Sequence, residues 1–144
     1  MTHTQLRFGD EARAKVLAGA TALADAVRVT LGPKAKSILI EKKWGSPLVC
    51  DDGVTIAKQV NLKEPEENLG AQMLRQAAVR TGDLVGDGTS TSTVVAHAVY
   101  ADGLRNVTAG ASAIDIKRGL DRGTKLAVER LTQLSRPVTN ITEK

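Results

Sequence analysis

The chain has 144 residues, of which 42% are hydrophobic, 25% are charged and 2% are aromatic, and its formal net charge is +4. This length suits one domain, and a core built from Ala, Val, Leu and Ile favours closely packed helices. Basic residues stand singly among acids, so we do not expect nucleic-acid binding. No apolar stretch approaches the ~20 residues that span a bilayer. A membrane role therefore has no support.

The single cysteine, Cys50, has no partner in the chain for a disulfide, and no charged and then apolar leader opens the sequence. We therefore expect an intracellular, cytoplasmic protein. His3 and His97 are far apart and have no cysteines beside them. The sequence favours ordinary packed or surface histidines over a metal site built on them.

The first predicted element is an amphipathic helix over residues 10–29, where apolar residues recur at steps of three and four. Asp10 is its expected N-cap. The helix should end at residues 30–33, because glycine adopts left-handed conformations and proline cannot continue a helical hydrogen-bond ladder. Two short apolar runs, 37–41 and 48–50, then predict a β-hairpin. Its open edges need another strand, from a longer chain or from a neighbouring subunit.

Two more helices are expected in the middle of the chain. Pro65 and the acids after it begin a helix that should run to about Leu84. A broad apolar stripe predicts the next helix from about Thr89 to Val107. The segment between the hairpin and Pro65, which starts with Asp51-Asp52-Gly53, is expected to be a turn and a loop.

A last helix is predicted from a capping box at Ser112 up to Pro137. Gly119 and Gly123 within it each cost about 1 kcal/mol relative to alanine, so we expect them to mark close contact with another helix. Four helices and one small hairpin make the predicted fold mainly α.

The most informative motif is Gly86-Asp87-Gly88, which is followed by five consecutive hydroxyl residues and an apolar run. The beginning of a helix offers unpaired N–H groups and a partial positive charge to an anion. Glycine lets a ligand approach the backbone closely, and Asp87 is a hard oxygen ligand of the kind that Mg²⁺ prefers. The motif suits phosphate and Mg²⁺ binding. The alternative is an ordinary turn followed by a hydroxyl N-cap.

Other phosphate-binding motifs are missing. No lysine follows Gly88, which excludes a Walker-type loop, and the chain shows no kinase signature set. Three turns, at residues 30–33, 51–53 and 86–91, lie at the ends of predicted elements, where loops can aim backbone amides at one ligand. Spacing alone does not show that they converge.

The chain resembles the group I, bacterial-type or GroEL-like chaperonins over residues 6–137. Five segments in the same order carry the resemblance: ADAVRVTLGPK (24–34), DGVTIAK (52–58), ENLGAQM (67–73), GDGTST (86–91) and KRG (117–119). It implies that residues 1–136 form the N-terminal half of the equatorial domain, which binds ATP and makes ring contacts. Residues 137–144 would begin the hinge toward an intermediate domain.

The resemblance also implies the ligands and the site residues. The ligands are ATP or ADP, Mg²⁺ and K⁺, with Asp87 as the metal ligand and Asp52 as the catalytic residue that positions the attacking water. The residues implied in nucleotide binding are Thr30, Leu31, Gly32, Pro33, Asp87, Gly88, Thr89, Ser90 and Thr91.

Two positions depart from the family pattern. Asp51 stands where relatives commonly carry a lysine, which replaces a favourable charge near phosphate with a repulsive one. The alternative is that only the backbone of residue 51 matters, because loop amides can contact phosphate without a side chain. Ser90 replaces the usual threonine and keeps the hydroxyl.

Subunits of this family continue past the equivalent of Pro137 into intermediate and apical domains and a returning segment with a second catalytic acid. We therefore do not expect this chain alone to be an efficient ATPase. Uncovered apolar helix faces predict association, including a homo-oligomer. Unfolded client proteins and a co-chaperonin are expected partners of the full-length protein only. The alternative function is a non-enzymatic helical oligomerisation module with a vestigial nucleotide site.

Overall fold

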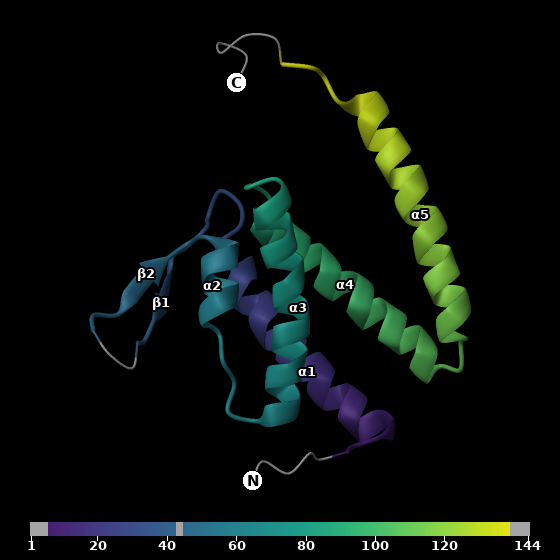
Figure 1. Cartoon of the computed structure of the whole chain (residues 1–144), viewed down its shortest axis with the longest axis horizontal. Coiled ribbons are helices and arrows are strands. Elements are labelled where there is room, and N and C mark those ends of the chain that lie inside the picture. Colours follow the sequence, from purple (N-terminus) through teal and green to yellow (C-terminus); the bar gives the residue numbers. More distant parts are fainter. Residues whose placement is uncertain (1–5, 43–44, 139–144) are drawn as a thin grey trace. The chain divides into compact units, whose positions relative to one another are not determined.

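The computed structural model describes residues 6–42 and 45–138. Over these residues it contains, in chain order, α1 (Gly9–Arg28), β1 (Ile38–Ile40), β2 (Leu48–Cys50), α2 (Gly53–Gln59), α3 (Pro65–Leu84), α4 (Thr89–Thr108) and α5 (Ala113–Leu134) (Figure 1). The mainly helical fold with one hairpin is confirmed. The additional helix is α2, which occupies part of the segment expected to be a loop.

The chain forms two compact units, one up to Leu104 and the other from Arg105 onward, so the boundary falls within α4. Three features of the sequence analysis lie outside the described residues. They are His3, the tip of the hairpin at residues 43–44, and residues 139–144 of the predicted hinge.

The first helix begins one residue earlier than its predicted cap. The N-cap is Phe8, which makes no side-chain cap bond, and Asp10 lies in the first turn of α1. The prediction that Asp10 is the N-cap is therefore wrong. Its carboxylate instead accepts a hydrogen bond from Arg13 at 2.9 Å, beside the positive end of the helix dipole, where an acid is favourable.

Two glycines set the close packing of α1 against α3. A Cβ atom at Gly19 would overlap the carbonyl group of Glu67, and one at Gly70 would overlap the carbonyl group of Val16. The helices can touch backbone to backbone only because both side chains are missing. The core that results contains Ala20, Leu23, Ala24, Val27, Ile56, Ala57, Ala71, Leu74 and Ala78. It is aliphatic throughout, as the composition predicts.

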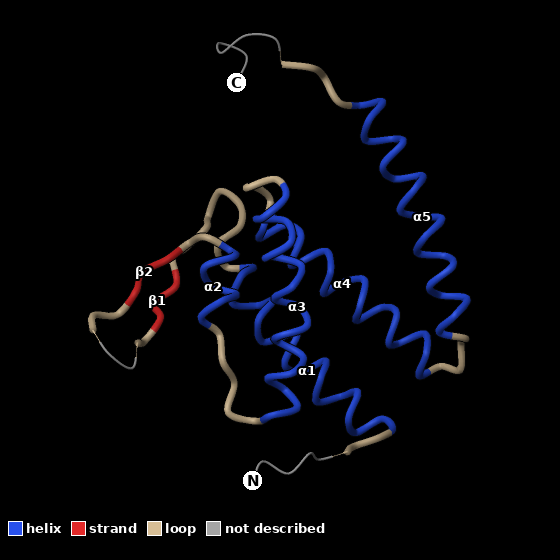
Figure 2. The backbone as a smooth tube through the Cα atoms, viewed as in Figure 1, coloured by secondary structure: helices blue, strands red, loops and turns tan. Residues whose placement is uncertain are grey.

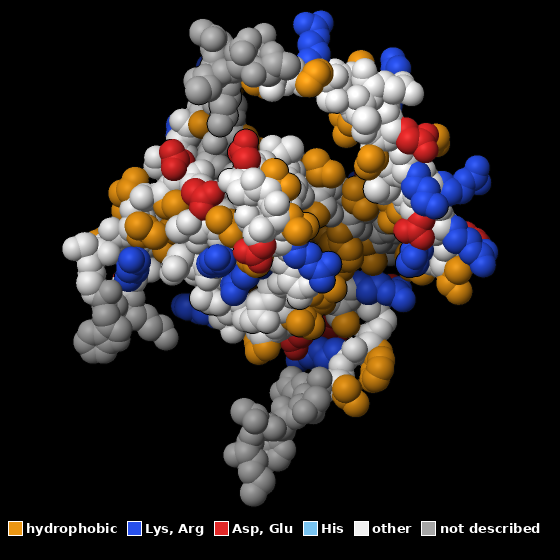
Figure 3. Space-filling view, turned by 45° about the horizontal axis from the view of Figure 1, so that its top comes forward, with side chains coloured by type: hydrophobic (Ala, Val, Ile, Leu, Met, Phe, Trp, Pro, Cys, Tyr) orange, Lys and Arg blue, Asp and Glu red, His pale blue; other side chains and the backbone are white. Residues whose placement is uncertain are grey.

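The hairpin pairs β1 with β2 in antiparallel register, with Leu39 opposite Val49. These two side chains are 69% and 66% exposed, while Ile38, Ile40 and Cys50 pack partly against the core. Within the described residues the sheet has only these two strands, so each keeps an open edge. Figure 3 shows that apolar side chains remain at several places on the molecular surface.

The first part of α4 packs on the same core through Ala96 and Tyr100. Thr21 Oγ1 and His97 Nε2 lie 2.9 Å apart and link α1 to α4, so His97 is a packed histidine. Burial raises the pKa of Tyr100 above its ordinary value. An apolar hollow of about 190 Å³ lies at this contact, lined by Val16, Ala20, Gly70, Met73, Leu74, Ala77, Ala96 and Tyr100.

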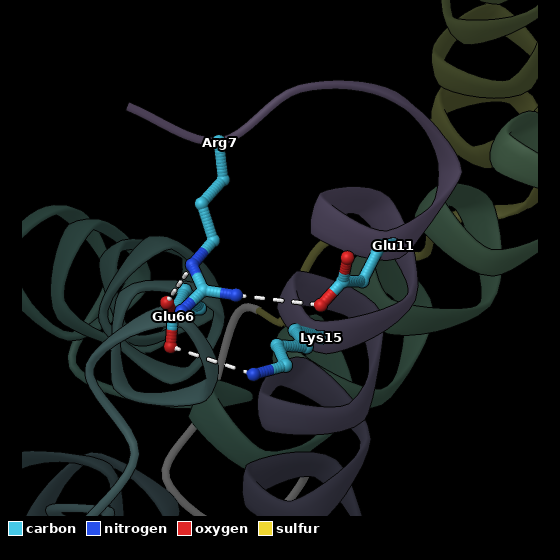
Figure 4. Close-up of polar contacts among 4 residues, drawn as sticks. All are labelled: Arg7, Glu11, Lys15 and Glu66. Carbon is cyan, nitrogen blue, oxygen red and sulfur yellow. Dashed lines mark hydrogen bonds and ion pairs between the residues drawn. The ribbon is translucent and has the colours of Figure 1, made fainter. Parts of the chain in front are cut away.

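A cluster of charges ties the segment before α1 to the beginning of α3 (Figure 4). Arg7 Nε lies 2.6 Å from the Glu66 carboxylate and Arg7 Nη1 lies 3.3 Å from that of Glu11, while Lys15 Nζ lies 3.9 Å from Glu66. The pKa of Glu66 is held below its ordinary value of 4.5 by its own backbone N–H first and then by Arg7 and Lys15, against an opposing effect of desolvation.

In the second unit, α5 is an amphipathic helix with no buried residue. Ser112 caps it by accepting a hydrogen bond from Asp115 N at 3.4 Å, as predicted. A methyl group at Gly119 or Gly123 would meet nothing within 4 Å. The close contact that these glycines predict is therefore not made within this unit. No helix over the described stretches is long and apolar enough to cross a bilayer.

The glycine contact between α1 and α3 gives a stability prediction. We expect Gly70→Ala to lower the free energy of unfolding by about 1–3 kcal/mol, since the added methyl group forces the helices apart. Urea denaturation followed by circular dichroism measures it. Gly119→Ala is the matched control and should not destabilise, because the site is open and alanine favours a helix. Equal stability of Gly70→Ala and the parent chain would contradict this packing.

The charge cluster gives a pH prediction. Because the pKa of Glu66 is lower in the folded state, its stabilising effect is present above pH 4.5 and is lost as the pH falls through the folded value. Glu66→Gln should therefore lower the melting temperature at pH 7, and the difference from the parent chain should shrink in acid.

Glu11→Gln is the control, because the side chain of Glu11 is 73% exposed and that of Glu66 only 18%. Its effect should be smaller, as is usual for exposed ion pairs. If the difference in melting temperature between Glu66→Gln and the parent chain stayed constant from pH 7 into acid, the charge of Glu66 would not be the source of the stabilisation.

Candidate functional site

Three loops that are far apart in the sequence, after α1, β2 and α3, lie near the beginnings of α2 and α4 (Figure 2). Residues from all three line one pocket of the first unit. The pocket has a volume of about 210 Å³. Its lining residues are Leu31, Asp51, Asp52, Gly53, Asp87, Gly88, Thr89, Ser90 and Thr91. The structure thus brings together the three turns whose convergence the spacing did not show.

Asp52 lies between β2 and α2 and is the N-cap of α2. Its Oδ2 accepts hydrogen bonds from Thr55 N at 2.9 Å and from Thr55 Oγ1 at 2.6 Å, and its Oδ1 accepts from Thr89 Oγ1 at 3.5 Å. The pKa of Asp52 is lowered, chiefly by the Thr55 hydroxyl, against an opposing effect of desolvation. The carboxylate is therefore ionised at neutral pH and reaches both helices.

The turn between α3 and α4 depends on its two glycines. Gly86 and Gly88 have φ of +76° and +74°, which L side chains rarely adopt. Asp87 stands exposed between them, and its Oδ1 accepts a hydrogen bond from Gly88 N at 2.7 Å. This turn places Gly88 immediately before the first residue of α4.

The beginning of α4 presents backbone donors to the pocket. Ser92 N donates to Gly88 O at 2.9 Å, so the N–H groups of Thr89, Ser90 and Thr91 precede the first such bond of the helix. Thr91 is exposed and Ser90 is half-buried, and both line the pocket. The pocket therefore combines free amides, hydroxyls and the positive end of a helix dipole.

The hydroxyl run divides between the fold and the pocket. Thr93 is fully buried and donates to Thr89 O at 2.8 Å, and Ser92 Oγ donates to the same carbonyl oxygen at 2.9 Å. Thr89 is 8% exposed and donates to Asp52. The hydroxyls of Ser92 and Thr93 are thus bonded within the first turn of α4, and that of Thr89 joins α4 to Asp52. Ser90 and Thr91 remain available to a ligand in the pocket.

The loop after α1 contributes less to the pocket than the other two. Of the four residues predicted there, Leu31 lines the pocket, and Thr30, Gly32 and Pro33 are not among its lining residues. Thr30 Oγ1 donates to Val27 O at 2.8 Å and so caps the end of α1. Gly32 has φ of +85°, which reverses the chain toward β1.

The oxygen atoms of the pocket are metal ligands of the kind that Mg²⁺ prefers. Carboxylates and hydroxyls are hard oxygen ligands, and Mg²⁺ in nucleotide sites is held by one or two carboxylates with phosphates and waters. Over the described ranges there is no group of three His, Cys, Asp or Glu residues able to hold a metal ion alone. The site fits an ion that arrives with a ligand.

Two further lining residues, Asp51 and Gly53, belong to the 51–53 turn that was expected near the ligand, but the contact of Gly53 with Ser90 was not predicted. A Cβ atom at Gly53 would lie 2.8 Å from Ser90 N, so only glycine lets the first turn of α2 lie against that of α4. The sequence does carry a signal for the beginning of α2, because Asp52 is followed three residues later by Thr55, an N-cap pattern before the apolar pair Ile56 and Ala57. Helix α2 was not predicted because it has only seven residues.

Residues 23–144, most of the chain, match the model of the TCP-1/cpn60 chaperonin family. The chain belongs to this family. The protein Chaperonin GroEL 5 from Bradyrhizobium diazoefficiens is 65% identical over 144 residues, which is 100% of this chain and 27% of that relative. The crystal structure of a group III chaperonin in the open state is similar with a TM-score of 0.74 at 27% identity, over 92% of this chain and 26% of the other.

This chaperonin chain therefore spans about a quarter of the length of these relatives. The resemblance to GroEL-like chaperonins that the five sequence segments carry is confirmed, and so is the fold that it implies. The roles of individual residues in nucleotide binding and catalysis stay predictions.

The cap on α2 in this chaperonin chain gives a prediction for Asp52. Asp52→Ala should lower the free energy of unfolding by about 1 kcal/mol, because Thr55 N loses its acceptor, and Asp52→Asn should lower it less. Chemical denaturation measures both. Asp51→Ala removes a neighbouring exposed acid that makes no such bond and should change stability little. Equal effects of Asp52→Ala and Asp51→Ala would contradict the cap.

Proposed function

We propose that this chain is the nucleotide-binding part of an ATP-dependent protein-folding chaperonin and that the pocket between α2 and α4 binds Mg-ATP. The observation that carries the proposal is the convergence of Leu31, Asp52 and the 87–91 turn on one pocket. These are segments that the family resemblance associates with nucleotide, and nothing in their sequence spacing required them to meet. The names of the relatives, both chaperonins, support the same function.

In this proposal each group in the pocket has a stated task. The amides of residues 89–91 and the hydroxyls of Ser90 and Thr91 bind phosphate oxygens at the positive end of α4, and Gly88 forms the turn that leads into them. Asp87 would hold Mg²⁺, which supplies neutralisation of phosphate charge, and K⁺ would lie nearby. Leu31 borders the nucleotide with its loop. Asp52, ionised and held by Thr55, orients a water molecule for attack on the terminal phosphate.

The partners follow from the family. In the whole protein we propose unfolded proteins as clients, a co-chaperonin and a ring of identical subunits. The second candidate function is a non-enzymatic helical oligomerisation module. It is favoured by the exposure of large apolar side chains, for example Leu39 at 69%, Val49 at 66% and Met73 at 57%. Light scattering on size-separated protein would reveal such an assembly.

Calorimetric titration with Mg-ATP tests the nucleotide site. We expect binding in the micromolar range, and Asp87→Asn should weaken it by at least about tenfold, the loss typical when a group supporting a metal is removed. Asparagine keeps an oxygen for Gly88 N, so the variant separates the charge from the turn.

Asp83→Asn is the control for this experiment. Asp83 is also exposed and lies near the end of α3, but it does not line the pocket, so binding should be unchanged. Absence of heat from the parent chain at millimolar Mg-ATP would contradict the proposal and favour the oligomerisation module. Equal affinity of Asp87→Asn and the parent chain would remove Asp87 as the metal ligand.

A further inference from the structure

Asp51 differs from the other two acids of the pocket in having no structural task. Asp52 caps α2 through Thr55, and Asp87 accepts a hydrogen bond from Gly88 N. No hydrogen bond or ion pair joins Asp51 to another residue in the described ranges, and it is exposed where it lines the pocket. The charge of Asp51 can therefore act on a ligand in the pocket.

The charged side chains that line the pocket are all negative. Three of its lining residues are aspartates, and none is lysine, arginine or histidine. The positive end of α4 is worth only about half an elementary charge. The lining therefore repels a polyanion that arrives alone, even though the amides at the beginning of α4 offer it hydrogen bonds. An anion that brings a cation with it meets much less repulsion.

We propose that Asp51 sets the ligand specificity of this pocket by rejecting free phosphate polyanions and admitting nucleotide complexed with a divalent cation. The proposal rests on the proposed nucleotide site. Asp51 acts through its charge at a distance and is a specificity-determining residue, with no part in the catalytic step. Its carboxylate disfavours free ATP, which carries four negative charges, more than Mg-ATP, which carries two.

The experiment compares two affinities in the full 144-residue chain. The dissociation constant is measured for ATP with EDTA and for ATP with excess Mg²⁺. We call the first constant divided by the second the magnesium dependence. Asp51→Asn removes the charge at nearly constant size, and Asp51→Lys reverses it. Asp10→Asn is the matched control. It makes the same change of charge at the far end of α1, about 27 Å along the helix from Arg28, well beyond the screening length.

We expect Asp51→Asn to reduce the magnesium dependence by at least about fivefold, because free ATP exceeds Mg-ATP by two charges and one unit charge about 4 Å away in water corresponds to about fivefold. Asp51→Lys should reduce it further, mainly through tighter binding of free ATP, and Asp10→Asn should not change it. Circular dichroism of each variant establishes that the fold is kept.

The outcomes separate this inference from the proposed function. Binding of Mg-ATP by the parent chain with an unchanged ratio in both Asp51 variants overturns the role of Asp51 alone. Binding of ATP by Asp51→Lys but not by the parent chain supports the repulsion while contradicting the nucleotide function of the natural sequence. Absence of binding by the parent chain and by both variants overturns both.

Discussion

The missing side chain at Gly53 lets the first turn of α2 lie against the first turn of α4. Ser90 N would be only 2.8 Å from a Cβ atom at that position, so any other residue would separate the two helices. This contact brings the carboxylate of Asp52 within reach of the Thr89 hydroxyl. The close packing of α1 on α3 at Gly19 and Gly70 supplies the base on which α2 sits. The pocket depends on both contacts, because each sets the position of a loop that lines it.

The same short segment serves the fold and the candidate site. A turn with a hydroxyl cap and a phosphate site were the alternative interpretations of the Gly-Asp-Gly motif and its hydroxyl run. In the structure the hydroxyls of Ser92 and Thr93 bond to the backbone and Thr89 bonds to Asp52, which accounts for three of the five. The other two hydroxyls, of Ser90 and Thr91, are not needed for these bonds. Both residues line the pocket, where a ligand would be bound.

The sequence predicts the long elements well and the short or tertiary ones poorly. Periodicity identified α1, α3, α4 and α5 because each has about twenty residues over which an apolar stripe repeats. It missed α2, whose seven residues complete barely two turns. The close helix contact was expected at Gly119 and Gly123, yet among the described residues it occurs at Gly19 and Gly70. Glycine within a helix signals close approach, but which glycine meets a neighbour depends on the three-dimensional packing.

The candidate site follows a similar division. The glycine turn and the beginning of α4 were predictable, since positive φ and unpaired amides are local properties. Spacing alone did not predict that this turn meets Asp52 and Leu31. The family resemblance implied it, and the structure shows it. The 51–53 turn was expected near the ligand, but the contact of Gly53 with Ser90 was not, because it depends on what lies opposite the glycine.

The proposed nucleotide site requires that the amides at the beginning of α4 bind phosphate. Backbone amide resonances of the ¹⁵N-labelled chain, recorded while Mg-ATP is added, report on these amides one by one. We expect the largest shifts at Gly88, Thr89, Ser90 and Thr91, with little change at the opposite end of α3. Saturating Mg-ATP that leaves these four resonances in place, or shifts only resonances elsewhere in the chain, would contradict the account.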